Sequence, residues 1–167
     1  TLLARNEAGW HNLMELNTIA HTEGGGFRPR VDMEVLHQHA DGLTCLSGCM
    51  SGPINRKLRE GDESGALQVA GELQDLYGKD HFFLELMRHG IAEQTLLTEG
   101  MVKLQPRIGD PLVATNDIHY LRGEDCRAQD AMLCLHQNAH INDDKRWRMG
   151  TEELFFRTSE QMNVVFS

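Results

Sequence analysis

The residues best suited to chemistry are the tetrad Asn116-Asp117-Ile118-His119, which directly follows the apolar run 111–115. Strand side chains alternate between two faces, so Asp117 and His119 are expected to project to one side at the end of a strand. A carboxylate and an imidazole held in this way can bind one divalent metal ion or orient a water molecule. The alternative is an ordinary loop in which Asp117 caps a following helix and His119 is partly buried.

Two other predicted strands also end next to residue types that bind metals. The three strands and the residues after them are Leu43–Ser47 before Cys49, Phe82–Met87 before His89-Gly90, and Leu112–Thr115 before Asp117 and His119. Parallel strands of α/β folds gather their chemistry at their C-terminal ends. We therefore predict that these three strand ends share one site.

Amphipathic segments between the strands predict the helices that must position this site. The predicted helices are Glu7–Ala20 with Asn6 as its N-cap, a short helix from Asp32 to about His39, Asp62–Tyr77 closed by Gly78, Ile91–Leu104, Glu124–Gln137, and a last one from Ser159. Strands separated by helices of this length indicate βα units in a parallel sheet or barrel.

Composition restricts the functions that these elements can serve. The net charge of −9, from 25 acidic and 16 basic residues, argues against a general DNA-binding surface, because phosphate contacts need Lys and Arg. The four cysteines form no CxxC pair, so reduced thiols in a cytosolic protein are expected. No segment approaches the roughly 20 apolar residues that cross a membrane. We expect a cytoplasmic protein with no membrane partner.

The strand ends also carry a resemblance that runs from the first residue nearly to the last. The matching segments are Thr1-Leu2-Leu3-Ala4-Arg5-Asn6 with Gly9 and Asn12-Leu13, Pro29-Arg30-Val31-Asp32, Gly42-Leu43, Leu46-Ser47-Gly48-Cys49, Phe83-Leu84-Glu85-Leu86 with His89-Gly90, Ala114 to Tyr120, Leu133-Cys134, Phe156, and Ser159-Glu160 with Met162. In these segments the chain resembles the polymerase-and-histidinol-phosphatase (PHP) domain of bacterial DNA polymerase III alpha subunits.

The resemblance implies a distorted seven-stranded β/α barrel of the α/β class, with up to three divalent ions at one mouth. Cys49, His89, Asp117 and His119 match ligands from the later part of that set. The remaining ligands, including a His-x-His motif, lie upstream of the Thr-Leu-Leu-Ala stretch in the family and are not in this sequence. We therefore expect an N-terminally truncated piece with an incomplete barrel over residues 1–123, and a helical segment over 124–167 that leads toward the polymerase palm.

The implied chemistry is phosphoester hydrolysis, such as a metal-dependent 3′–5′ exonuclease in the parent protein. Bound metals would lower the pKa of a water and neutralise charge on a phosphate. Mixed O, N and S ligands suit Zn²⁺ or Mn²⁺ better than Mg²⁺, which prefers oxygen. The implied partners are the remainder of the alpha subunit, DNA through that parent protein, the proofreading exonuclease subunit and other replisome subunits.

Each candidate ligand also has a structural interpretation. Cys49 could be an inert buried thiol in a tight turn, and His89 could simply bond backbone. Glu85 shares strand parity with His89, so it is predicted either to orient a ligand or to form a buried ion pair; Asn116 is a further candidate for orienting a ligand.

Three functions remain open from the sequence. The first is a part of a DNA polymerase III alpha subunit, in which the isolated chain makes no DNA. The second is a free-standing PHP phosphoesterase acting on a small phosphate ester. The third is a metal-free scaffold that binds partner subunits.

Overall fold

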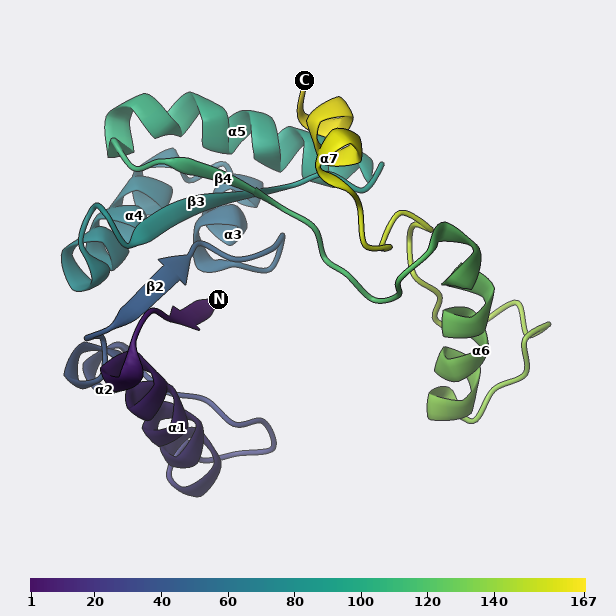
Figure 1. Cartoon of the computed structure of the whole chain (residues 1–167), viewed down its shortest axis with the longest axis horizontal. Helices are drawn as coiled ribbons and strands as arrows, with labels where there is room; N and C mark the ends of the chain where they lie inside the picture. The colour runs from purple at the N-terminus through teal and green to yellow at the C-terminus, as the bar shows by residue number, and fades with distance from the viewer. The chain divides into compact units, whose positions relative to one another are not determined.

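The computed structural model describes residues 1–167 as a mixed α/β chain (Figure 1). Its strands are β1 (Leu2–Ala4), β2 (Leu43–Leu46), β3 (Phe82–Met87) and β4 (Leu112–Thr115). Its α-helices are α1 (Glu7–Thr22), α2 (Met33–Gln38), α3 (Pro53–Arg59), α4 (Glu63–Tyr77), α5 (Ala92–Ile108), α6 (Cys126–Gln137) and α7 (Ser159–Phe166), and a 3₁₀ turn, η1 (Gly123–Asp125), precedes α6. The sequence pattern predicted neither β1 nor α3.

The four strands form one open mixed sheet in the order β1-β2-β3-β4. Strand β1 pairs antiparallel with β2, whereas β2 pairs parallel with β3, placing Cys45 opposite Phe82. On the other side of β3, the Leu84 N–H donates to the Pro111 carbonyl at 2.9 Å. The parallel pair confirms the predicted βα organisation, and an open sheet is consistent with an incomplete PHP barrel.

Side-chain caps fix where several helices begin, and the cap at Asn6 was predicted from the sequence. The carboxamide of Asn6 accepts the Gly9 N–H at 2.9 Å, and Asp32 caps α2 through the Val35 N–H. Asp62 caps α4 in the same way, accepting from Gly65. Because the first N–H groups of a helix lack partners within it, each cap supplies one.

The apolar core of the first part of the chain lies between the sheet and the helices that follow β2. Leu43, Phe82 and Leu84 are fully buried strand residues, and Ile54 of α3 is buried with them. Helix α4 packs against both α3 and β2. Cys45 is part of this core, and burial raises the pKa of its thiol to about 11, which keeps the thiol protonated and unreactive.

The chain folds as two compact units, each containing sequentially separate segments. The first unit comprises residues 1–85 and 101–113, and the second comprises 86–100 and 114–167. The predicted boundary after residue 123 is a functional division that these units do not test, and it stays a prediction. None of the helices has the length and apolar character required to span a bilayer.

Candidate functional site

The loop after β4 holds the predicted pair Asp117 and His119. The Nδ1 atom of His119 lies 3.1 Å from the Asp117 carbonyl and 3.7 Å from its carboxylate. Because a carbonyl only accepts, Nδ1 carries the proton in that bond, and the lone pair of Nε2 is left for a ligand. Side-chain exposure is 52% for Asp117 and 33% for His119. The Nε2 atom of His119 and the Asp117 carboxylate are each available to a ligand, and the His N–H is bonded to backbone as in many metal sites. That the two bind one metal ion stays a prediction.

The alternative interpretation of this tetrad is confirmed in that the tetrad lies in a loop, but the helix cap that it assigned to Asp117 is wrong. No helix begins after Asp117, and the next regular element is η1 at Gly123. The loop is instead held by backbone bonds to a distant segment: the His119 N–H donates to the Leu154 carbonyl at 2.8 Å, and the Phe156 N–H donates to the Tyr120 carbonyl at 3.0 Å.

His89 lies in the same unit and contacts this loop, but it is almost completely buried, with 1% of its surface exposed. Its Nε2 atom is 2.7 Å from Asn116 Oδ1, and its Nδ1 atom is 3.0 Å from Gln94 Nε2. Its carbonyl accepts the hydroxyl of Thr151 at 2.6 Å. Both ring nitrogens are thus bonded to side-chain amides, and His89 offers no free lone pair in this arrangement.

Asn116 joins His89 to the C-terminal segment. Its Nδ2 donates to the Phe155 carbonyl at 2.5 Å, and Arg157 donates to its Oδ1 at 3.0 Å. The structure places Asn116 against His89, and the prediction that Asn116 orients a metal ligand stays a prediction.

Cys49 and Glu85 lie in the first unit. Cys49 is exposed and free, so its interpretation as a buried thiol is wrong. It follows Gly48, whose φ of +89° favours glycine, and the Gly48 N–H donates to Glu85 Oε2 at 3.0 Å. The Glu85 N–H in turn donates to Ser47 Oγ at 2.9 Å. Glu85, which is only 5% exposed, therefore shapes the turn that presents Cys49.

The structure gathers the candidate ligands only in part. No three His, Cys, Asp or Glu side chains lie together in a way that could hold a metal ion. Within the second unit His89 contacts Asn116 and the Asp117 N–H, and Asp117 lies beside His119. That the three strand ends share one site stays a prediction. The same holds for the choice of Zn²⁺ or Mn²⁺ and for the assignment as ligands of Cys49, His89, Asp117 and His119.

Two residues that sequence reasoning missed complete the second-unit network: Gln94 and Arg157. Gln94 lies on the buried face of α5, and that face could have given a signal. Its buried residues are Gln94, Leu97, Thr98, Met101 and Leu104, spaced as one helical stripe. A polar amide at the start of an apolar stripe requires a hydrogen-bond partner. Nothing in the local sequence indicates the partners of Arg157.

The comparisons with known proteins agree with the fold. A sequence model described as "PHP domain" matches residues 1–89. The chain belongs to the PHP domain family. This PHP domain chain is 40% identical over 165 residues to the DNA polymerase III subunit alpha of Treponema pallidum, and 38% identical over 166 residues to that of Borreliella burgdorferi. It is 35% identical over 165 residues to the subunit alpha of Thermus aquaticus.

Each of these matches covers 99% of the PHP domain chain but only 13–14% of the relative. Residues 90–167 lie beyond the family match yet within the matches to the polymerase subunits. The resemblance that the sequence segments indicated is therefore confirmed over nearly the whole chain.

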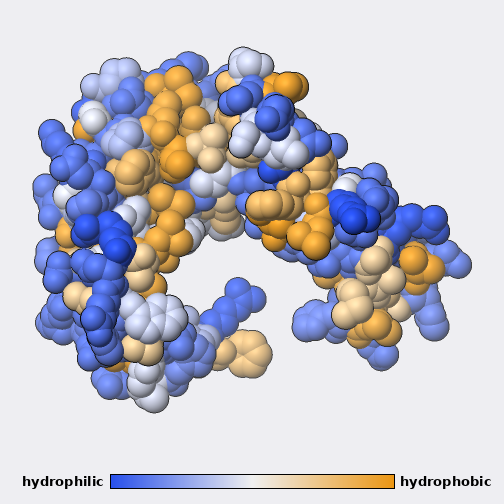
Figure 2. Space-filling view, viewed as in Figure 1, coloured by the Kyte–Doolittle hydropathy of each residue, from blue (hydrophilic) through white to orange (hydrophobic).

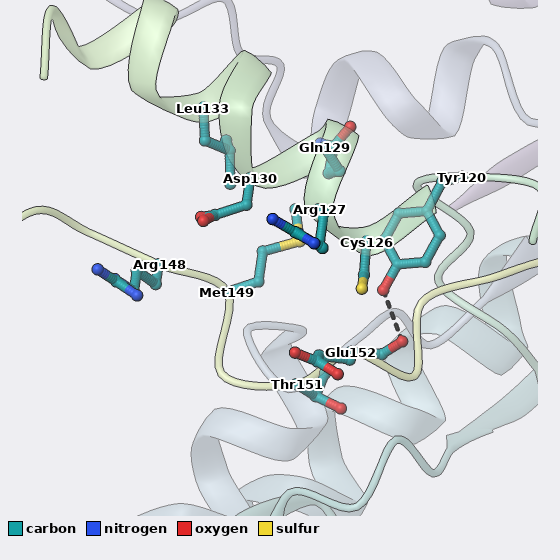
Figure 3. Close-up of a pocket in the computed structure, with 10 residues that line it drawn as sticks. All are labelled: Tyr120, Cys126, Arg127, Gln129, Asp130, Leu133, Arg148, Met149, Thr151 and Glu152. Carbon is teal, nitrogen blue, oxygen red and sulfur yellow. Dashed lines mark hydrogen bonds between the residues drawn. The ribbon is translucent and has the colours of Figure 1, made fainter. Parts of the chain in front are cut away.

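A separate pocket of about 150 Å³ lies between α6 and residues 148–152 (Figure 3). Side chains from the helix face those of the later segment across it, and the Tyr120 hydroxyl donates to the Glu152 carbonyl at 2.6 Å. Asp130 lines the pocket and is bonded by both terminal nitrogens of Arg146, at 2.6 and 2.5 Å. The Arg146 bonds hold the pKa of Asp130 below its usual 3.8.

In Asp130→Asn the melting temperature is expected to fall less steeply as the pH is lowered. A carboxylate with a lowered folded-state pKa stabilises the fold above about pH 4, and this contribution is lost as the pH falls through the folded pKa. Melting temperatures measured between pH 2 and pH 7 should therefore fall less steeply with acid in Asp130→Asn than in the parent. The control is Asp75→Asn, at an exposed position of α4, which should follow the parent. Identical acid slopes for all three would contradict the role of the Arg146 pair.

Proposed function

We propose that the chain serves as the PHP portion of a bacterial DNA polymerase III alpha subunit, acting in DNA replication. The observation that carries the proposal is the 40% identity to one such subunit over 99% of the chain. The chain spans about 14% of that relative's length. We infer that template-directed synthesis depends on other parts of such a subunit, which would also supply the contacts to DNA that a chain of charge −9 does not favour.

The proposal predicts that these 167 residues incorporate no nucleotide on a primed template. The measurement is primer extension with the purified chain, with a complete alpha subunit of a relative as the positive control. Extension by the chain alone would overturn the assignment of synthesis to other regions.

Within this portion we propose a divalent metal site at Asp117 and His119, with Zn²⁺ or Mn²⁺ favoured over Mg²⁺. The exposed carboxylate and the unoccupied Nε2 of His119 support it. A bound metal would supply Lewis-acid activation of water and of a phosphate oxygen for phosphoester hydrolysis. The residues of the chain bind and orient: Asp117 provides the charge, and its carbonyl fixes the ring of His119. Cys49 and His89 are further ligands only by sequence prediction.

Zn²⁺ titration of the chain tests this site. We expect weak binding, because two side chains fill only part of a coordination sphere, and we expect Asp117→Asn or His119→Gln to weaken it about 10-fold or more. His136→Gln is the matched control, since His136 is an exposed histidine on α6. Equal affinity in all four proteins would exclude the site, and three tightly held ions per chain would contradict the incomplete cage.

A metal-free scaffold is the second candidate, and one observation favours it. Both ring nitrogens of His89 are bonded to protein amides, and no three ligand-type side chains gather. Such a domain would bind the rest of the alpha subunit, the proofreading exonuclease subunit or other replisome subunits without hydrolysing anything. Absence of Zn²⁺ and Mn²⁺ binding in the titration would select this candidate.

A further inference from the structure

A buried amide, Gln94, contacts His89 at two points. The backbone N–H of His89 donates to Gln94 Oε1 at 2.9 Å, and Gln94 Nε2 lies 3.0 Å from His89 Nδ1. A backbone N–H can only donate, so the oxygen of the carboxamide must face it and the NH₂ group must face the ring. Nδ1 is therefore the acceptor, and the proton of the neutral imidazole resides on Nε2.

The opposite side of the ring leads independently to the same tautomer. Arg157 donates to Asn116 Oδ1, while Asn116 Nδ2 donates to the Phe155 carbonyl, so the orientation of this second amide is fixed without reference to His89. An oxygen consequently faces His89 Nε2 at 2.7 Å, and Nε2 must donate. The Asp117 N–H lies farther from Nε2, at 3.2 Å, and cannot donate to Nε2 while that atom carries the proton.

We propose that Gln94 is a positioning residue that holds His89 in the Nε2–H tautomer, so that the His89 ring donates a hydrogen bond to Asn116. The ring then supports the residue immediately before Asp117, and metal contact is left to Asp117 and His119. Gln94 and His89 are 6% and 1% exposed, so solvent does not compete for these bonds. The tautomer follows from the hydrogen bonds alone; only the consequence for metal contact rests on the proposed function.

The tautomer is measured directly by long-range ¹H–¹⁵N correlation spectra of the assigned imidazole nitrogens in the metal-free chain. We expect Nδ1 of His89 to be unprotonated in the parent. Gln94→Glu should reverse this, because a carboxylate has no proton to donate and would accept one from Nδ1 while still accepting the backbone N–H. Gln68→Glu, the same substitution at an exposed position of α4, should leave the His89 signals unchanged.

Two results would overturn the inference: a protonated Nδ1 in the parent, or unchanged His89 signals in Gln94→Glu. The parent measurement decides the question even if the variant does not fold. Adding Zn²⁺ separates this inference from the proposed metal site. We expect the ring signals of His119 to move and those of His89 to stay. A shift of the His89 ring signals that shows metal binding would overturn the inference that His89 bonds Asn116 instead of a metal. A spectrum without any change would exclude the metal site but would not affect the assignment of the tautomer.

Discussion

Gly9→Ala is expected to lower the free energy of unfolding of the first unit by about 3 kcal/mol. Gly9 lies in the first turn of α1, where the helix passes against the backbone at Gly42. A Cβ at position 9 would come 1.9 Å from the Gly42 carbonyl oxygen. Since the obstructing atom is backbone, no side-chain rotation can relieve the overlap, and α1 must move away from β1 and β2, against which it packs.

The matched control is Gly71→Ala. Gly71 is also a helical glycine, in α4, but a Cβ built there meets no atom within 4 Å. We expect this variant to be unchanged or more stable by up to about 1 kcal/mol, because alanine is the better helix former. Chemical denaturation followed by circular dichroism gives both values. Equal stability of the two variants would show that α1 does not need its close approach to Gly42.

The elements that could be predicted from the sequence are those specified by nearby residues. Each helix cap lies three residues from the N–H group that it accepts, so a cap can be recognised from the nearby sequence. The capping residues are Asn6, Asp32 and Asp62. Strand β1 lies beyond this reach: three residues carry no useful periodicity, and their structure depends on pairing with β2 about forty residues away. Helix α3 is seven residues long, too short for a clear amphipathic pattern, and its N-cap Gly52 has no side chain that could mark its start as Asp32 marks that of α2.

The geometry of the candidate site could not be predicted from the sequence. Asp117 and His119 were expected together because they share strand parity, but β4 ends at Thr115 and the pair lies in a loop. The conformation of this loop is instead fixed by backbone bonds to Leu154 and by Asn116, which bonds Phe155 and Arg157 about forty residues away. Pairing across such separations is decided by tertiary packing, so no local pattern could reveal it.

The sequence also could not predict which apolar side chains of α6 are exposed. Apolar atoms reach the surface in the region of α6 (Figure 2), where Met132 and Leu135 are 61% and 75% exposed. The helix was predicted from its periodicity, and Cys134 is its one buried residue. Which other apolar residues of α6 would be buried could not be read from the pattern, because burial depends on the elements that pack against each face.

Arg157→Met is expected to destabilise the second unit by about 2 to 3 kcal/mol. The Arg157 side chain is only 4% exposed, and its guanidinium donates to three groups: Glu153 at 2.7 Å, Asn116 Oδ1 at 3.0 Å and the Arg88 carbonyl at 3.2 Å. Methionine fills most of the volume but donates nothing. The Arg88 carbonyl then loses this donor, whereas Glu153 is half exposed and regains water, which limits the total.

Arg127→Met is the control, because Arg127 is exposed on α6 of the same unit and should change stability by no more than about 0.5 kcal/mol. Hydrogen exchange distinguishes a general loss of stability from the specific one proposed. The N–H of His119 is bonded to Leu154. Relative to the parent, its exchange in Arg157→Met should accelerate more than that of the helical amides of α6. If both regions accelerate equally, Arg157 stabilises the unit as a whole. If only the loop accelerates, the buried guanidinium holds Asn116 and, through it, the backbone that presents Asp117 and His119.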